Sequence, residues 1–333
     1  MTKKMSNDLV SFGETMIRLS APDTQRLEQA TSMDLHVGGS ESNVAVAVKR
    51  LGLDTAFVTR LTNNPLGRMV ANKIREHGVD VSGIEWTNED RVGKYFLEFG
   101  ANPRPSSVIY DRANSAISNV QKGTINWEST FSEARLFHTS GITPALSKSA
   151  EAVTEEAMKA AKSAGLKVSV DLNYRSKLWS QAKAKKCMTG LMDYTDILVT
   201  TEEDTERVFD IAGESYEEVA KKLAREFDFE VVAITLRDNI SMWRNDWTAI
   251  AYEDGKIYDD MTYELELVDR VGGGDSFTAG FLYGYLTGDA QKGVKYGNAT
   301  SAIKQTNPGD MNWCTHEEVE SLAEGGGRVR INR

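Results

Sequence analysis

The feature that most constrains the fold of this 333-residue chain is a regular alternation of strand-like and helix-like segments. Short apolar runs alternate with longer stretches in which apolar residues recur every three or four positions. Such alternation indicates crossover units packed on a largely parallel sheet, and therefore an α/β fold. We expect strands at 8–12, 135–139, 166–172, 196–199 and 230–236, and helices at 42–51, 66–74, 149–164, 202–209, 216–227, 275–286 and 290–304.

Two segments, 14–37 and 92–112, interrupt this alternation. In the second segment Tyr95, Leu97 and Phe99 alternate with Lys94, Phe96 and Glu98, which is the period of a strand. We expect the two segments to form a small second sheet that serves as a lid over the main site. The alternative is an ordinary hairpin at the edge of the main sheet.

Composition excludes several classes of protein. There are 39 Lys and Arg against 49 Asp and Glu, a formal net charge of −10, which argues against a broad nucleic-acid or anionic-membrane surface. No apolar stretch approaches the roughly 20 residues that span a bilayer, and residues 1–8 do not resemble a signal peptide, so we expect a cytoplasmic protein. Cys187, Cys314 and four scattered histidines lack metal-ligand spacing, which argues against structural zinc and a zinc hydrolase.

Three consecutive glycines, Gly272, Gly273 and Gly274, precede Asp275 and an apolar helical segment. Glycines let backbone N–H groups approach an anion closely, and a helix N-terminus adds free donors and a positive dipole end. An aspartate beside a bound phosphate repels it, so the presence of Asp275 needs a chemical reason. Accepting the proton of a hydroxyl is such a reason. The alternative is a flexible turn in which Asp275 caps a helix that begins at Ser276.

A second glycine cluster, Gly38-Gly39-Ser40-Glu41-Ser42-Asn43, opens another predicted helix far upstream. The pair of clusters resembles the ribokinase-like carbohydrate kinases of the phosphofructokinase-B type, over about residues 9–319. This resemblance implies one ribokinase-like domain over 1–333, with Gly39 and Asn43 at the acceptor sugar and Asp275 as catalytic base. The amides of residues 272–274 would stabilise the transferring phosphoryl group. No P-loop or dinucleotide-binding glycine motif is present.

Several segments are similar to the 2-keto-3-deoxygluconate kinases of this family. The resemblance implies that Arg175, in Asp171-Leu172-Asn173-Tyr174-Arg175, meets an acidic sugar, because a guanidinium can pair with a carboxylate in bidentate fashion. Further sugar contacts implied by the resemblance are Tyr95, Tyr110, Arg112 and Asp310. The alternatives are a surface ion pair for Arg175 and packing within the lid for the two tyrosines.

The nucleotide side departs from the family pattern. The usual Asn-x-x-Glu is Thr201-Glu202-Glu203-Asp204 here, so Asp204, or alternatively Glu203, is the candidate for holding Mg²⁺ through a water molecule. The usual Thr-x-Gly is Thr235-Leu236-Arg237, in which Arg237 either reaches a phosphate or faces solvent. By the same resemblance, the residues expected at the nucleotide are Thr201, Thr235, Arg237, Gly272, Gly274 and Asn298.

The resemblance implies ATP and Mg²⁺ as cofactors, leaves a monovalent cation open, and implies a homodimer that forms through the lid. The function expected is ATP-dependent phosphorylation of 2-keto-3-deoxygluconate, or a close acidic relative, to its 6-phosphate. Two alternatives remain: a kinase of the same fold for a neutral sugar such as fructose or ribose, and a non-catalytic sugar-binding sensor.

Overall fold

A computed structural model describes residues 7–326 and shows two sheets. Residues 1–6 lie outside this range. They belong to the segment 1–8, for which the sequence predicts no signal peptide. The larger sheet has ten strands in the order β13-β12-β11-β10-β9-β8-β1-β4-β5, with β14 paired to β12. Its strands are β1 Leu9–Phe12, β4 Thr55–Thr62, β5 Ile84–Thr87, β8 Leu136–Ser140, β9 Lys167–Asp171, β10 Ile197–Thr200, β11 Val231–Ser241, β12 Arg244–Glu253, β13 Lys256–Asp259 and β14 Tyr263–Glu266.

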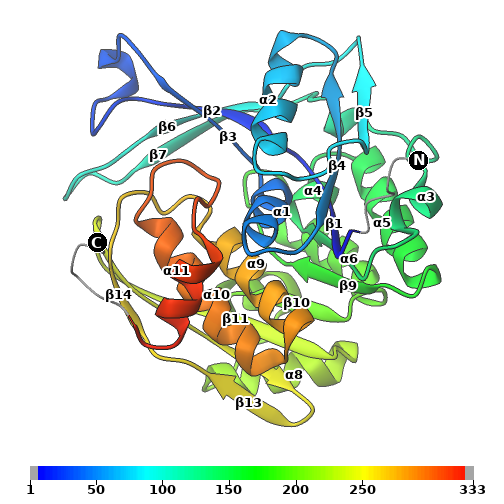
Figure 1. Cartoon of the computed structure of the whole chain (residues 1–333), viewed down its shortest axis with the longest axis vertical. Helices are drawn as coiled ribbons and strands as arrows, with labels where there is room; N and C mark the ends of the chain where they lie inside the picture. Colours follow the sequence, from blue (N-terminus) through cyan, green and yellow to red (C-terminus); the bar gives the residue numbers. More distant parts are fainter. Residues whose placement is uncertain (1–6, 327–333) are drawn as a thin grey trace.

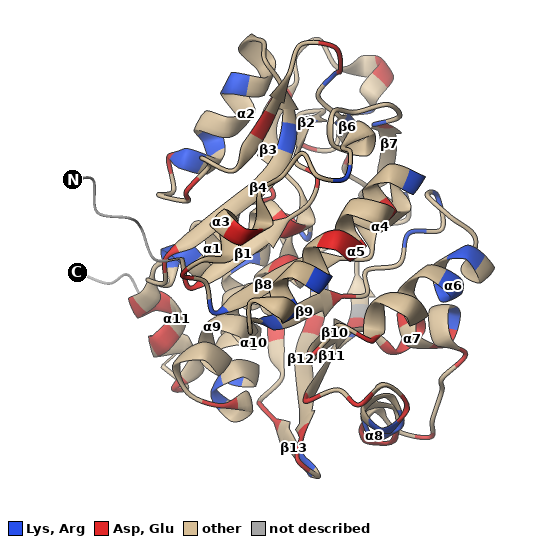
Figure 2. Cartoon of the chain, turned by 90° about the vertical axis from the view of Figure 1, so that its right-hand side faces the viewer, with Lys and Arg blue, Asp and Glu red and all other residues tan. Residues whose placement is uncertain are grey.

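The strands from β5 to β11 are parallel, whereas β12, β13 and β14 pair in antiparallel fashion. Helices cover both faces of this sheet, so the expected α/β architecture with a mostly parallel sheet is confirmed (Figures 1 and 2). The helices are α1 Ser40–Arg50, α2 Pro65–Arg75, α3 Trp127–Phe131, α4 Ile142–Ala145, α5 Lys148–Ser163, α6 Gln181–Met192, α7 Glu202–Phe209, α8 Tyr216–Phe227, α9 Gly273–Thr287, α10 Ala290–Gln305 and α11 His316–Ala323, with short 3₁₀ helices η1 Leu27–Gln29 and η2 Ile117–Asn119.

Strand β1 explains why the core strands are apolar at successive positions. Side chains of a strand alternate between faces, so Leu9 packs in the cluster under α1, α9 and α10, while Val10 and Phe12 pack in the cluster under α5. A parallel strand covered by helices on both sides therefore reads as a continuous apolar run. Figure 2 shows basic positions on the outer helices α2 and α6, and α8 carries both acidic and basic residues.

The segments that interrupt the alternation form a smaller, separate sheet with the order β3-β2-β6-β7, seen at the upper left of Figure 1. Its strands are β2 Met16–Ser20, β3 Asp34–Gly38, β6 Lys94–Glu98 and β7 Ser107–Asp111. All but one residue of these strands lie within the expected segments 14–37 and 92–112, and the alternative of a hairpin at the edge of the main sheet is wrong.

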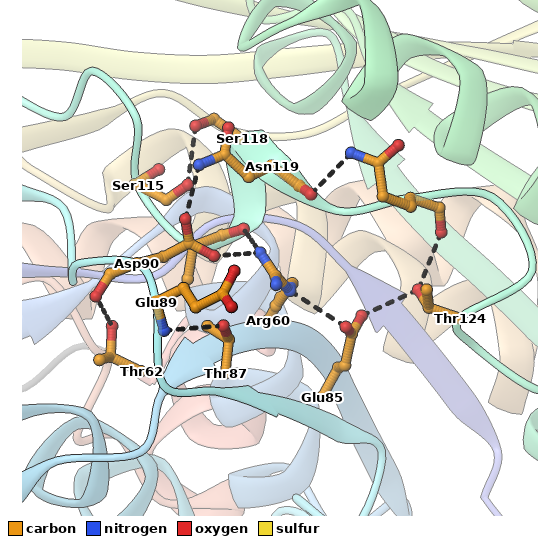
Figure 3. A network of polar contacts seen from close by, with 12 residues as sticks. Arg60, Thr62, Glu85, Thr87, Glu89, Asp90, Ser115, Ser118, Asn119 and Thr124 are labelled. Carbon is orange, nitrogen blue, oxygen red and sulfur yellow. Dashed lines mark hydrogen bonds and ion pairs between the residues drawn. The ribbon is translucent and has the colours of Figure 1, made fainter.

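A polar network around Arg60 anchors the chain where it leaves the main sheet for the smaller one (Figure 3). Arg60, on β4, pairs through Nε with Glu85 of β5 at 3.0 Å and through Nη1 with Asp90, just before β6. Asp90 in turn accepts a 2.7 Å hydrogen bond from Asn119 of η2, which follows β7. One arginine thus connects the segment that enters strands β6 and β7 with the segment that follows them.

Several elements were not predicted, among them β4, α6 and α11, and two predicted elements have different bounds. Helix α9 begins at Gly273, two residues before the expected start, so the second and third glycines are part of its first turn. Strand β11 extends to Ser241 rather than ending at 236, because it continues as a long hairpin with β12. Of the described residues, no helix is both long and apolar enough to cross a membrane.

Candidate active site

A cavity of about 420 Å³ lies where α1, α9, the smaller sheet and the carboxyl ends of β9, β10 and β11 meet. This is the edge at which open parallel α/β sheets bind their ligands. The predicted site residues that line it are Gly39, Asn43, Tyr95, Tyr110, Arg112, Arg175, Thr201, Asp204, Thr235, Arg237, Gly272, Gly273, Gly274, Asp275 and Asp310.

Asn298 is the predicted site residue that does not line this cavity. Its side chain is fully buried in α10, where Nδ2 donates to Asp260 at 3.4 Å and Oδ1 has no partner among the described residues. A role at the nucleotide therefore remains a prediction for Asn298.

The two glycine clusters meet at the carboxylate of Asp275. Ser40 donates from Oγ to Oδ1 at 2.8 Å, and Asn43 donates from Nδ2 to Oδ2 at 2.7 Å, both from the first turn of α1. Asn173 donates to the Ser40 hydroxyl at 3.1 Å and so supports this arrangement from the end of β9. Both oxygens of Asp275 are thereby oriented by groups on rigid elements.

Burial raises the pKa of the Asp275 carboxyl, while the hydrogen bonds from Asn43 and Ser40 and the charge of Arg175 oppose the increase. The position of Asp275 in the first turn of α9 also favours its ionised form, because a helix N-terminus carries partial positive charge. The result is a carboxylate that is held in place yet more basic than a solvent-exposed aspartate.

The glycine loop itself is conformationally specific. Gly272 has φ of +83°, and a Cβ there would lie 2.1 Å from the carbonyl oxygen of Asp310. A Cβ at Gly274 would meet no atom within 4 Å. The N–H of Gly273 donates to the Arg270 carbonyl at 3.2 Å, so this amide is engaged within the protein, and its contact with a phosphoryl group remains a prediction. The N–H groups of residues 274 and 275 lie in the first turn, where an α-helix offers no internal acceptor.

Several other carboxyl groups line the cavity with Asp275, and burial raises the pKa of three of them. The pKa of Glu41 rises to about 6, that of Asp171 rises well above its ordinary value, and that of Asp204 also rises. Asp171 is further affected by the charges of Asp275 and Asp204, and Arg175 lowers the pKa of both Asp171 and Asp204. The cavity thus brings these carboxyl groups together near an exposed guanidinium.

That guanidinium belongs to Arg175, whose side chain is exposed and has no ion-pair partner in the described part of the chain. Arg112 differs, because its Nε donates to Glu14 at 2.7 Å and its Nη2 contacts the same oxygen. Arg112 therefore lines the cavity with its charge already balanced. A contact between Arg112 and the sugar remains a prediction.

Asp310 is likewise engaged within the protein. Its Oδ2 pairs with Arg18 at 3.0 Å, and its Oδ1 accepts a hydrogen bond from the hydroxyl of Tyr95. Tyr110, the other predicted tyrosine, lies opposite Tyr95 on β7 with ring centroids 5.7 Å apart. The two rings form part of the cavity wall contributed by the smaller sheet.

On the side expected for the nucleotide, Thr201 and Asp204 cooperate at the start of α7. The Thr201 hydroxyl caps the helix by accepting from the Asp204 N–H at 3.1 Å, and Asp204 accepts from the Tyr174 N–H at 3.1 Å. Thr235 donates to the Thr200 carbonyl at 3.5 Å, and Arg237 is exposed. Within residues 7–326 no group of three or more His, Cys, Asp and Glu is arranged to bind a metal.

Sequence reasoning missed Ser40, Glu14 and Arg18. Ser40 lies inside a motif that was recognised, but nothing local marks it as a partner of a residue in α9. Arg18 and Glu14 are buried charges close to the apolar residues Met16, Ile17 and Leu19, and this proximity is the one signal that the sequence offers for them.

Glycine clusters that meet at a buried aspartate, in a cavity at the edge of a parallel sheet, define a phosphotransferase site for a hydroxyl-bearing acceptor. The model of the pfkB family carbohydrate kinases matches residues 6–317, and the chain belongs to this family. It is 40% identical over 323 residues to a 2-dehydro-3-deoxygalactonokinase of Haloferax volcanii, covering 97% of this chain and 98% of that one.

Two further relatives are named for the gluco compound. A 2-dehydro-3-deoxygluconokinase of Bacillus subtilis is 29% identical over 333 residues, covering 96% of each chain. The crystal structure of a 2-dehydro-3-deoxygluconokinase from Thermotoga maritima superposes with a TM-score of 0.93 at 44% identity, covering 96% of this chain and 100% of that one. The ribokinase-like fold is therefore confirmed.

Proposed function

We propose that this carbohydrate kinase transfers the terminal phosphoryl group of ATP to the terminal hydroxyl of 2-keto-3-deoxygluconate, or of a close acidic keto-deoxy sugar, giving the 6-phosphate. The observation that carries this proposal is the carboxylate of Asp275, held by Ser40 and Asn43 beside the glycine loop. The names of the relatives support the sugar class and divide between the gluco and galacto compounds.

Asp275 acts as the general base in this proposal. It accepts the proton of the sugar hydroxyl as that oxygen bonds to phosphorus and the bond to the nucleotide breaks. Free N–H groups in the first turn of α9 stabilise the negative charge of the transferring group. Fixed hydrogen bonds from Ser40 and Asn43 keep the carboxylate aligned without a reorganisation step.

The nucleotide side fits a polyphosphate with Mg²⁺. Asp204, the candidate for holding Mg²⁺ through water, lines the cavity together with Arg237 and Arg270, and burial and the charge of Arg237 lower the pKa of Arg270. Two guanidinium groups that repel each other are stabilised by an anion between them. When bound, Mg²⁺ neutralises charge on the donor phosphates.

Arg175 supports an acidic acceptor. Its exposed guanidinium lines the cavity and has no ion-pair partner among the described residues, while its charge lowers the pKa values of Asp171, Asp204 and Asp275. A sugar carboxylate can pair with Arg175 in bidentate fashion and compensate its charge.

We further propose that the smaller sheet is a lid and that its outer face forms a homodimer. Register places Leu35, Leu19, Phe96 and Ile109 in one row across all four strands, with Leu35 45% and Ile109 55% exposed. An apolar row on an exposed sheet face favours association with a second copy. Light scattering should give a dimer for the native protein and a monomer for Ile109→Lys, and a native monomer would contradict this proposal.

The test of the activity is ADP release with ATP and Mg²⁺ against 2-keto-3-deoxygluconate, its galacto epimer, gluconate, fructose and ribose. We expect turnover on the keto-deoxy acids. Turnover confined to fructose or ribose would overturn the acidic substrate but keep the kinase, and sugar binding without turnover on any compound would overturn the kinase. The relative turnover rates on the gluco and galacto epimers decide which of the two compounds is the preferred substrate.

A further inference from the structure

Lys304 is a fully buried lysine that the proposed chemistry does not use. It lies in the last turn of α10, and its ammonium donates to two main-chain carbonyls, those of Asp269 at 3.1 Å and Asn307 at 3.2 Å. A buried ammonium is costly unless it is hydrogen bonded and its charge is compensated. We therefore ask which charges around Lys304 compensate its buried ammonium group.

The surrounding charges balance only when Lys304 is included. Arg18 pairs with Asp269 at 2.7 Å and with Asp310 at 3.0 Å, and none of the three side chains is more than 3% exposed. Two carboxylates face two cations, Arg18 and Lys304. Burial lowers the pKa of Lys304, whereas the charges of Asp269 and Asp310 oppose that decrease. Without the ammonium, one buried negative charge would be left uncompensated.

This cluster directly supports the glycine loop. The Asp269 carboxylate accepts from the N–H of Val271 at 3.0 Å and from the N–H of Gly309 at 2.9 Å, so it joins the start of the loop to the turn after α10. Gly272 packs against the carbonyl of Asp310, and its Cβ position lies 3.3 Å from Cε of Lys304. The ammonium bridges the same two segments through Asp269 and Asn307.

We propose that Lys304 is a positioning residue whose ammonium group acts as a built-in monovalent cation, holding the glycine loop against residues 307–310 so that the enzyme needs no added K⁺ or Na⁺. The effect on turnover rests on the proposed kinase activity, but the effect on stability does not. The monovalent cation that the family resemblance leaves open is supplied by the chain itself.

The groups around the Lys304 ammonium are also suitable ligands for a free monovalent cation. Removing the side chain beyond Cβ leaves a space lined by two carbonyl oxygens and carrying net negative charge. Backbone carbonyls that replace the hydration shell are the ligands that K⁺ takes in proteins. Lys304→Ala therefore creates a site for K⁺ or NH₄⁺, whereas Lys304→Met fills the same space with an apolar chain and creates none.

The experiment begins with the native protein, exchanged into buffer with tetramethylammonium as the sole monovalent cation besides buffer ions. Thermal unfolding and ADP release are then measured while KCl, NaCl or NH₄Cl replaces tetramethylammonium chloride at constant ionic strength. We expect neither the unfolding temperature nor kcat of the native protein to respond. A native protein that gains stability or turnover with K⁺ would overturn the proposal, and this measurement requires no variant.

The variants then test position and charge. Lys304→Ala should unfold at lower temperature and lose about 100-fold in kcat, the scale of a displaced reacting group, with little change in KM for the sugar. In Lys304→Ala, K⁺ or NH₄⁺ should restore the unfolding temperature and kcat, and both effects should saturate with cation concentration. In Lys304→Met, neither cation should restore either quantity. Lys295→Ala removes an exposed lysine from the same helix and should behave as the native protein.

Native kcat in Lys304→Ala without K⁺, or no restoration by either cation, contradicts the proposal. If the native protein phosphorylates no sugar in any salt, the proposed function fails while the unfolding temperatures still decide the role of Lys304.

Discussion

The side-chain amide of Asn43, in α1, donates a 2.7 Å hydrogen bond to Oδ2 of Asp275, in α9, although 232 positions separate the two residues. The bond joins the N-terminal turns of two helices that pack against each other beside the main sheet. It connects the cluster expected at the sugar with the cluster expected at the phosphate. The site is therefore built by the packing of α1 on α9, and its function depends on that packing.

Asp275→Asn should lower kcat by about 10²- to 10⁴-fold, the range for loss of a general base. Sugar binding, measured by calorimetry, should persist, because the remaining cavity residues are unchanged. Thermal unfolding serves as the control for folding. A variant that keeps most of its turnover would remove Asp275 from the role of base.

The pH profile of kcat/KM should have an acidic limb set by Asp275. Its pKa is raised by burial, so activity that requires the ionised carboxylate should be lost, as pH falls, at higher pH than for an ordinary aspartate. Asn43→Leu removes a hydrogen bond that lowers this pKa, and the limb should move further toward higher pH. Identical limbs in the native protein and Asn43→Leu would contradict the assignment.

Arg175→Gln should reduce kcat/KM for an acidic sugar by about 10- to 100-fold, since a hydrogen bond to a charged group contributes about 1.5–3 kcal/mol. The residual rate on a neutral sugar should not fall, because such a sugar offers no carboxylate to Arg175. Arg207→Gln is the matched control: Arg207 lines the same cavity but pairs with Glu203 at 3.2 Å. Equal losses on acidic and neutral sugars would show that Arg175 does not read the acid group.

Gly272→Ala and Gly274→Ala should differ in stability although the two glycines belong to one loop. A Cβ at Gly272 meets the Asp310 carbonyl at 2.1 Å with φ at +83°, and left-handed backbone alone costs about 1–2 kcal/mol for alanine. Gly274 is helical and its Cβ position is open, so alanine there should not destabilise the fold. Urea unfolding of the two variants measures the difference, and equal stabilities would contradict it.

Arg60→Ala should destabilise the protein by about 3 kcal/mol, because it leaves Glu85 and Asp90 partly buried without their common partner (Figure 3). Lys159→Ala removes an exposed pair with Glu155 and should cost less than about 1 kcal/mol. Urea unfolding of both variants gives the comparison. A loss for Arg60→Ala no larger than for Lys159→Ala would show that the network does not anchor the smaller sheet.

Local sequence patterns predicted some regular elements closely, although β4, α6 and α11 were not predicted. The helices at 202–209 and 216–227 have the expected bounds, because capping residues and apolar spacing are both local signals. The start of α9 was placed two residues late, since consecutive glycines read as loop unless the packing around them is known. Strands β12, β13 and β14 were not predicted at all, because antiparallel pairing depends on partners distant from the local pattern.

Sequence by itself determined the fold class and named the aspartate, the glycines and several of the polar residues that line the cavity, because glycine runs, helix starts and alternating apolar segments are local chemistry. Only the tertiary structure decided how charges are shared. It paired Arg112 with Glu14, enclosed Asp310 between Arg18 and Tyr95, and left Arg175 free. Which charges neutralise one another depends on distances between elements far apart in the chain, and burial then sets the cost of leaving any of them unpaired.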